Sequence, residues 1–331
     1  MRILVVGAVE GGSLSVGRAM YTAFREIGQE AEFLDYSDYL DDFVKVVETK
    51  DNDLSDQFLL KCNIRLMQRV LDFRPDAILG IAQSPMVNPE ILIKLRKAGI
   101  ILCFWFVEDY RIFEYWKSYA PFFNHYFTIQ KDPFWEKLKE MGCHNFYYLP
   151  AAFDDSYRNG NTVPQPEINV SFVGAPYPNR VHFFSQLKRR DFQIYGHRWE
   201  EHNTGPVVIG DRWVSDNEAK SIYQRSLVNI NLHSSSCPES FGDGDFVNPR
   251  TFELAGMGVF QLTDMRQLLP LHFDLKEELV TLNSWEDMKR AIDYFLEHET
   301  ERSAFAKRVQ ARVLRDYTYK KRAEEIVNIL S

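Results

Sequence analysis

The sequence predicts an α/β protein of two domains, each built around a parallel sheet. A length of 331 residues is consistent with two domains. Short apolar runs alternate with helical segments along the chain, and these runs are continuously apolar, as in strands covered on both faces. A polar segment at 153–168, which contains Asn159, Gly160 and two prolines, separates two such series. It is expected to be a linker or a loop at a domain edge.

The first series predicts the first domain, over residues 1–155. Strands are expected at 2–7, 31–36, 75–82, 100–109, 125–130 and 145–152, and helices at 14–27, 54–73, 88–99 and 110–118. The helix at 88–99 has Asn88 as its N-cap, Pro89 at its first position and Gly99 beyond its end.

The second series predicts the second domain, over residues 165–315. Strands are expected at 169–175, 192–199, 227–233, 258–264 and 278–283, and helices near 179–189, at 216–225, after Asn248 and from Ser284, with two more at the C-terminus. The last helix, near 319–330, has an apolar face formed by Ala323, Ile326 and Val327. It is expected to return to the first domain, which would then include residues from about 316 to 331.

Composition and charge exclude several classes of protein. A formal net charge of -8 argues against general binding of nucleic acids, which requires a basic surface. The four cysteines form no CxxC pair, and the eight histidines have no HExxH spacing, so neither a metal nor a cofactor is expected. The sequence shows no signal peptide and no apolar run long enough to span a membrane, and a cytoplasmic location is expected.

A glycine-rich segment near the N-terminus, "GAVEGGS" at 7–13, fits neither common nucleotide-binding motif. It has Ser13 where a phosphate-binding loop has Lys, and it is not a GxGxxG sequence. Gly11 and Gly12 are expected to form a flexible turn that faces a cleft. The alternative is a strand-to-helix turn without a ligand. No GxSxG sequence supports serine-hydrolase chemistry.

The stretch "DGDFVNPRTFELAGMG" at 243–258 predicts an anion site. Asn248 is a good N-cap and Pro249 is favoured at the first helical position, so a helix is expected to start here and to end near Gly256. A helix N-terminus offers free N–H groups and the positive end of the helix dipole. Arg250, in the first turn, would add a guanidinium for a diphosphate.

Glu253 lies about one turn into this helix and is a candidate acceptor for ligand hydroxyl groups. A ribose diol offers two donors to the two oxygens of a carboxylate. Asp245 precedes Glu253 with seven residues between them, which gives an acidic-x7-Glu arrangement. The alternative for Glu253 is a structural ion pair or a solvated charge.

The chain resembles the CgeB-like group of GT-B glycosyltransferases, strongly over residues 170–325. The resemblance depends on "NPRTFELAGMGVFQLTD", on "FVGAPYPNR" at 172–180, on "YGHRW" at 195–199, on "NINLH" at 229–233 and on "YTYKKR" at 317–322. It is weaker over residues 1–150, where "FWFVED" at 104–109 is the similar segment.

The resemblance implies two facing Rossmann-like domains, with a nucleotide-sugar donor bound to the second and an acceptor to the first. It implies no bound metal, and it assigns the first acid of the pair to the sugar and the second to hydroxyl groups of the donor. Asp245 is shorter than the Glu of many relatives, which leaves its role and a retaining outcome open. The candidate donor-binding residues are Gly174, Arg180, Tyr195, Gly196, Trp199, Asn248, Arg250, Thr251 and Glu253. The candidate catalytic residues are Glu108, Asp109 and Asp245. Gly11, Gly12 and Ser13 form the candidate acceptor-side loop, called the cleft loop.

Tyr195 and Trp199 are expected to stack on the base, and Glu108 or Asp109 to act as a general base toward an acceptor hydroxyl. The acceptor itself, whether a glycan, a protein or a small molecule, is not specified by the sequence, nor is the oligomeric state. Two alternatives stay open: a sugar-nucleotide epimerase of the same architecture, and a non-catalytic sensor or scaffold that binds a nucleotide-sugar.

Overall fold

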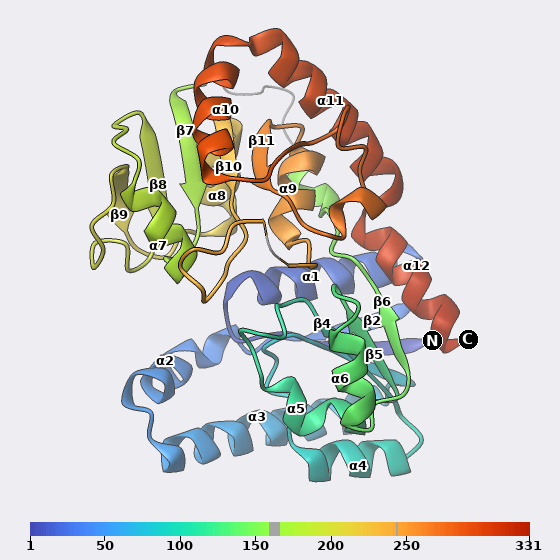
Figure 1. The fold of residues 1–331 in the computed structure, drawn as a ribbon. Helices are drawn as coiled ribbons and strands as arrows, with labels where there is room; N and C mark the ends of the chain where they lie inside the picture. Colours follow the sequence, from blue (N-terminus) through green and yellow to red (C-terminus); the bar gives the residue numbers. More distant parts are fainter. Residues whose placement is uncertain (159–165, 243) are drawn as a thin grey trace. The chain divides into compact units, whose positions relative to one another are not determined.

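The computed structural model describes residues 1–158, 166–242 and 244–331. Asp243 and most of the predicted linker, including Asn159 and Gly160, lie outside the described residues. The chain divides into two compact units, Met1–Pro150 together with Tyr319–Ser331, and Ala151–Thr318. Figure 1 shows a layer of helices against a sheet in each unit.

The first unit is a six-stranded parallel sheet with the order β2-β1-β3-β4-β5-β6. Its strands are β1 (Arg2–Val6), β2 (Glu30–Leu34), β3 (Ala77–Ile81), β4 (Ile101–Phe106), β5 (His125–Thr128) and β6 (Phe146–Tyr148). Its helices are α1 (Gly11–Glu26), α2 (Leu40–Thr49), α3 (Asn52–Phe73), α4 (Pro89–Lys97), α5 (Trp116–Tyr119), α6 (Phe134–Glu140) and α12 (Tyr319–Leu330). The C-terminal α12 packs against α1, so both chain termini belong to this unit.

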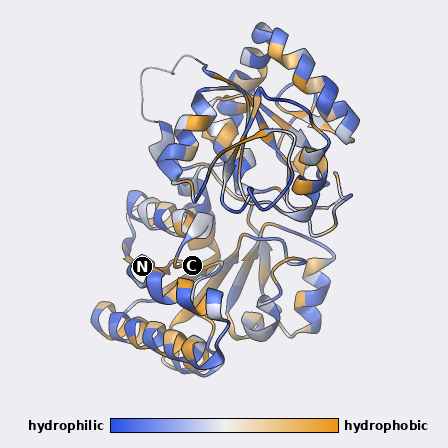
Figure 2. Cartoon of the chain, turned by 90° about the vertical axis from the view of Figure 1, so that its left-hand side faces the viewer, coloured by the Kyte–Doolittle hydropathy of each residue, from blue (hydrophilic) through white to orange (hydrophobic). Residues whose placement is uncertain are grey.

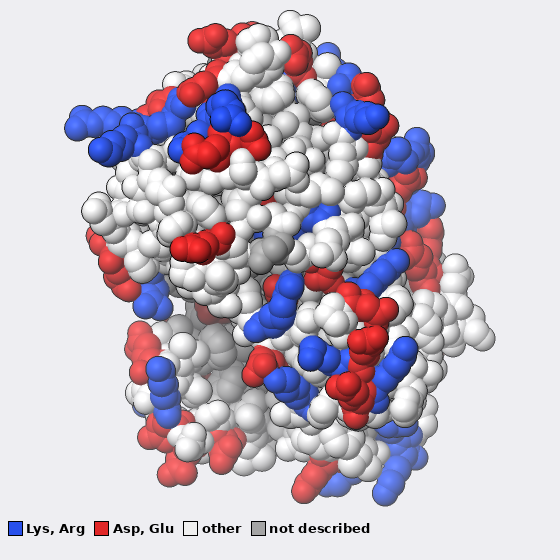
Figure 3. All heavy atoms as spheres, in the orientation of Figure 1, with Lys and Arg blue, Asp and Glu red and all other residues white. Residues whose placement is uncertain are grey.

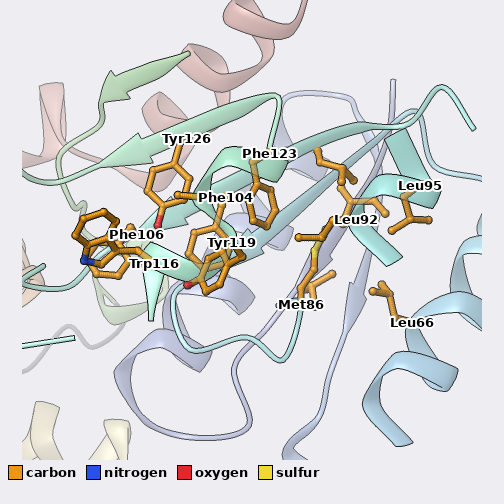
Figure 4. Close-up of a cluster of buried hydrophobic side chains, with 14 of the residues drawn as sticks. Leu66, Met86, Leu92, Leu95, Phe104, Phe106, Trp116, Tyr119, Phe123 and Tyr126 are labelled. Atoms are coloured by element: carbon orange, nitrogen blue, oxygen red, sulfur yellow. The ribbon is translucent and has the colours of Figure 1, made fainter. Parts of the chain in front are cut away.

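The core of the first unit is rich in aromatic side chains. Figure 4 shows the rings of Phe104, Phe106, Tyr119, Phe123 and Tyr126 gathered where β4 and β5 meet the segment around α5. All five are at most 5% exposed. Such large rings bury much apolar area at a small cost in side-chain entropy, so the central strands form a rigid support for the loops at their ends.

The second unit is a six-stranded parallel sheet with the order β12-β11-β10-β7-β8-β9. Its strands are β7 (Ile168–Val173), β8 (Phe192–Gly196), β9 (Val207–Asp211), β10 (Ser226–Asn231), β11 (Gln261–Asp264) and β12 (Val280–Leu282). Its helices are α7 (Pro178–Ser185), α8 (Asp216–Gln224), α9 (Pro249–Met257), α10 (Trp285–Glu297) and α11 (Glu299–Asp316). Figure 2 shows hydrophobic residues concentrated in the strands and on one side of the helices, as expected for covered sheets.

The structure corrects three expectations about elements. The helix expected over 110–118 is reduced to α5, because the Asp109 carboxylate accepts the Arg111 backbone N–H at 3.0 Å and closes a turn instead. The helix after Asn248 continues past Gly256 to a left-handed cap at Gly258, which has φ 70°. Gly11 and Gly12 form the first turn of α1 rather than a flexible turn that precedes the helix.

Three elements were not expected from the sequence: α2, α6 and β9. The residues of α2 are largely exposed and acidic at its start, and β9 is an edge strand with an exposed Gly210. Both carry a short apolar pattern that the sequence analysis did not use: Phe43 and Val46 of α2 pack against the core, and β9 begins with the apolar residues 207–209.

Candidate functional site

The strand order of the second unit predicts a ligand site beyond the carboxyl ends of β7 and β10. These two strands are neighbours, while the chain continues from β7 outward to β8 and from β10 outward in the other direction to β11. In open parallel sheets, ligands bind beyond the carboxyl ends of the strands at such a switch point. Gly174 follows β7 at this edge, and Asn231 ends β10.

Two glycines allow the chain to approach itself closely at this edge. Gly174 and Gly196 have φ values of 152° and 149°, which side chains rarely tolerate. A Cβ on Gly196 would lie 2.3 Å from the Gly174 carbonyl oxygen, and one on Gly174 would lie 3.2 Å from Nη2 of Arg250. Gly196 therefore allows the end of β8 to lie against Gly174, and Gly174 leaves room for the Arg250 guanidinium.

The structure assigns Trp199 to the core rather than to base stacking. Its side chain is 0% exposed, packs between Phe172 and Phe184, and donates an indole hydrogen bond to the Gly174 carbonyl at 2.6 Å. A base cannot stack on an enclosed ring. Tyr195, 9% exposed, packs in a small core cluster and donates to Gln193 Oε1 at 2.5 Å, so it too serves mainly in packing.

A different aromatic pair is exposed after β8 and β9. Trp213 is 65% exposed, and its ring lies 5.4 Å from that of His197, which follows Gly196 directly. The sequence analysis missed this pair. The available signal was a Trp that comes directly after Asp211 and Arg212, in a loop that follows a strand.

Two guanidinium groups lie together over a ring of β7. Arg180, in α7, and Arg250, in α9, both lie over the Phe172 ring, at 5.0 and 5.4 Å. Arg180 is 6% exposed and donates only to backbone carbonyls, those of Leu232 and Ala175. Burial and the neighbouring Arg250 charge lower the pKa of Arg180 to about 9.

Arg250 donates from Nε to the Tyr223 hydroxyl at 3.0 Å, and its Nη1 has no hydrogen-bond partner among the described residues. Neither Arg180 nor Arg250 forms an ion pair with a carboxylate in the described part of the chain. Two adjacent cations that form no ion pair with a described carboxylate favour the binding of an anion, because the anion offsets their mutual repulsion.

The N-terminus of α9 starts as the sequence predicts. The Asn248 side chain accepts the Thr251 N–H at 3.0 Å, with Pro249 at the first position. Thr251 is fully buried, and its hydroxyl donates to Asn248 and accepts from Asn231, so it supports the helix start from within.

Glu253 is a half-buried carboxylate without a hydrogen bond or an ion pair to any described residue. Burial raises the pKa of Glu253 to about 7; Arg250 opposes this rise, whereas Asp216 and Asp154 add to it. A carboxylate that lacks partners within the protein is suited to accept hydrogen bonds from a ligand.

Asp245 is 4% exposed and lies in the segment 244–248, which leads into α9. A buried polar cluster that the sequence analysis missed holds this segment. This cluster consists of His233, Asp264 and Arg266, all at most 1% exposed. His233 follows β10, Asp264 ends β11, and Arg266 lies in the loop after β11. The three residues therefore belong to no short sequence motif.

The candidate catalytic acids of the first unit have different surroundings. Glu108, after β4, is 9% exposed and accepts hydrogen bonds from the Gln83 amide and the Tyr115 hydroxyl. Burial raises the pKa of Glu108 to about 7, although these two hydrogen bonds oppose the rise. Asp109 is ion-paired with Arg111 at 2.9 Å and closes a turn, so its carboxylate has a structural role.

The cleft loop lies after β1, beside the end of β3, which is the switch point of the first sheet. Gly11 and Gly12 face open space, whereas Ser13 is 7% exposed. Gln83, at the end of β3, has an exposed side chain and a left-handed backbone with φ 63°. The structure therefore places this loop and the Glu108 group at the same edge of the first sheet.

Neither metal clusters nor membrane spans are found in residues 1–158, 166–242 and 244–331. No group of three or more His, Cys, Asp or Glu side chains there is arranged to hold a metal ion. None of the helices described is both long and apolar enough to cross a membrane. Acidic and basic side chains are interspersed on the face drawn in Figure 3.

Comparisons with known proteins find similar sequences and similar folds. The sequence model of the "Glycosyl transferase-like" family matches residues 180–328. The spore protein CgeB of Bacillus subtilis is 23% identical over 258 residues, which are 72% of this chain and 78% of that protein. The chain is similar to CgeB over this length. The matched region contains Arg180, the cluster around His233 and the whole of α9.

Solved structures show the same architecture. An alpha-glucosyltransferase in complex with UDP and a 13-mer DNA has a TM-score of 0.72 at 12% identity, over 100% of this chain and 99% of that one. Anabaena HepE in complex with UDP-glucose has a TM-score of 0.63 at 9% identity, over 99% and 98%. The chain thus has the GT-B fold.

Proposed function

We propose that the chain transfers a sugar from a nucleotide-diphosphate sugar to an acceptor, without a metal ion and with retention at the anomeric carbon. The observation that carries the proposal is the pair Arg180 and Arg250, two guanidiniums without a carboxylate partner at the start of α9. Together with the helix N-terminus they supply the positive charge that a leaving diphosphate requires. A metal ion would supply the same charge in other enzymes.

Glu253 would bind the ribose or sugar hydroxyls, and Asp245 would face the sugar. Glu253 lacks partners within the described residues, and Asp245 lies at the spacing seen in retaining relatives. Two of the similar structures are complexes, one with UDP and one with UDP-glucose, which makes a uridine diphosphate sugar the first donor to test. Trp213 and His197, in place of Trp199, would contact the base.

The experiment is calorimetric titration of the protein with UDP, UDP-glucose and a panel of other nucleotide-sugars, with and without a chelator. Arg250→Met should weaken UDP binding about 10- to 100-fold, because it removes charge-assisted hydrogen bonds to the diphosphate. The matched control is Arg315→Met, which changes an exposed Arg of the same unit and should leave binding unchanged.

Absence of binding by every nucleotide in the panel would contradict the proposal. Loss of binding on chelation, restored by a divalent cation, would contradict metal independence. Binding without release of UDP, across a range of acceptors, would favour the sensor over the enzyme. The anomeric configuration of the product, read by proton NMR, tests retention.

A further inference from the structure

The buried cluster of His233, Asp264 and Arg266 contacts the segment that carries both Asp245 and the start of α9. Asp264 Oδ1 lies 2.8 Å from His233 Nδ1 and accepts the His233 backbone N–H at 2.9 Å. Asp264 Oδ2 accepts from Arg266 Nε at 2.8 Å. Three polar side chains are thus fixed in the interior by mutual hydrogen bonds, as buried polar groups must be.

The other ring nitrogen of His233 determines the tautomer. Nε2 lies 3.1 Å from the backbone nitrogen of Asn248, the N-cap of α9. A backbone N–H can only donate, so Nε2 must carry a lone pair and Nδ1 must carry the proton that is donated to Asp264. If both ring nitrogens were protonated, the Nε2–H group and the Asn248 backbone N–H would be two donors facing each other.

The protonation state agrees with this geometry. Burial lowers the pKa of His233 to about 4, although the Asp264 charge opposes the change; the Arg266 and Arg180 charges act in the same direction as burial. Although burial raises the pKa of Asp264, Arg266 and His233 together bring it well below its usual range. A neutral imidazole between an ionised carboxylate and a backbone donor is therefore the stable state at neutral pH.

His233, Arg266 and the neighbouring Gln267 hold residues 244–246 of the segment. The Phe246 ring lies edge-on to His233 at 5.2 Å and under the Arg266 guanidinium at 5.4 Å. The Gln267 N–H donates to the Gly244 carbonyl at 3.0 Å. Asp245 lies between these two anchored residues.

We propose that His233, with its tautomer set by Asp264, is a positioning residue that holds Asp245 and the N-terminus of α9 in place for the donor. The inference rests on the proposed function, because it concerns the same donor site. His233 touches no donor group itself. It acts through the Asn248 N–H, whose position determines where the first free N–H groups of α9 point.

A matched pair of variants separates positioning from packing. His233→Gln places an amide oxygen near the position of Nε2 and can still accept from Asn248. His233→Asn places an amide nitrogen near Nδ1, so it keeps the hydrogen bond to Asp264 but loses the acceptor. Both variants remove the ring that packs on Phe246, so their melting temperatures should fall by similar amounts.

Calorimetric titration with UDP and hydrogen exchange without ligand are the two measurements. His233→Asn should raise the Kd for UDP about tenfold relative to His233→Gln, as expected for one lost hydrogen bond. Amide exchange over 244–251 should be about tenfold faster in the Asn variant than in the Gln variant. Equal Kd values and equal exchange rates in the two variants would overturn the proposal.

The tautomer can be measured on the parent protein, which keeps the inference testable if both variants fail to fold. Nitrogen-15 NMR of the imidazole should show a protonated Nδ1 and an unprotonated Nε2 at pH 7, and the opposite tautomer would overturn the inference. If the parent binds neither UDP nor UDP-glucose, the proposed uridine donor is wrong, whereas the exchange and tautomer measurements still decide the role of His233.

Discussion

At the scale of single residues, two carboxylates have a raised pKa but different surroundings. Glu253 in the second unit lacks hydrogen-bond partners among the described residues, whereas Glu108 in the first unit is held by Gln83 and Tyr115. Burial raises the pKa of both to about 7. The first is suited to bind ligand hydroxyls, and the second to exchange a proton near neutral pH.

Glu253→Gln should weaken donor binding about 10- to 100-fold, because hydrogen bonds to a charged acceptor are lost. Titration with both UDP-glucose and UDP shows whether the lost affinity belongs to the sugar or to the nucleotide part of the donor. If the variant binds the donor as the parent does, Glu253 is not the anchor.

The same variant should change stability in a pH-dependent way. The folded pKa of Glu253 lies above its unfolded value, so the folded state binds more protons between about pH 4.5 and 7. Parent stability should therefore fall as pH rises through this window. Glu253→Gln should be more stable than the parent at pH 8, with no such advantage at pH 4.5, as measured by urea unfolding at both values. A constant difference between the proteins would contradict the raised pKa.

Glu108→Gln should reduce turnover about 10²- to 10⁴-fold if Glu108 accepts the proton of the acceptor hydroxyl, and it should leave UDP affinity unchanged. Parent turnover should rise with pH through about 7, as the carboxyl ionises. The control is Asp109→Asn, which loses the ion pair with Arg111 and should affect stability more than turnover. A flat pH profile would argue against this role.

At the scale of elements, helix starts perform different tasks in the same unit. Asn248 caps α9 and Ser284 caps α10, each by accepting a backbone N–H of its own first turn. Only the first start lies beside Arg180 and Arg250. The two caps therefore allow helix stability to be separated from donor binding.

Asn248→Ala and Ser284→Ala should each reduce the free energy of unfolding by about 1 kcal/mol through the lost cap. Asn248→Ala should also weaken UDP binding, because the α9 N-terminus loses its fixed position, whereas Ser284→Ala should not. Thermal melts and UDP titration measure the two effects. Equal UDP affinities would show that the α9 cap has no part in the donor site.

At the scale of the whole molecule, the chain leaves the first unit at Pro150 and returns to it at Tyr319. In α12, Ala323 and Ile326 are at most 1% exposed, and the Tyr319 ring lies 6.2 Å from that of Trp105. The last helix is therefore part of the first core, although it follows the second unit in sequence.

Ile326→Ala should destabilise the first unit by about 2–5 kcal/mol, since it removes a buried aliphatic side chain. Hydrogen exchange should accelerate in α1, which contacts α12, and stay unchanged in α9. Asn328→Ala, at an exposed position of the same helix, is the control and should change stability by no more than about 0.5 kcal/mol. Acceleration in α9 but not in α1 would contradict this assignment.

The sequence by itself determined the α/β class, most strands and the helix starts at Asn88, Asn248 and Ser284. These depend on local causes: continuous apolar runs for covered strands, and a side-chain oxygen within reach of the next turn for the caps. The sequence also indicated Arg250 and Glu253, because an Arg and a Glu near a Pro-started helix are unusual among apolar neighbours.

The tertiary structure alone decided the strand order, the burial of Trp199 and the cluster of His233, Asp264 and Arg266. It also decided that Gly256 is internal to α9, where a Cβ would lie 2.2 Å from the Phe153 ring. Each of these features depends on contacts between segments that are far apart in sequence, so no local sequence pattern predicts it. Burial and pKa depend on which neighbours surround a side chain, and those neighbours meet only when the sheets assemble.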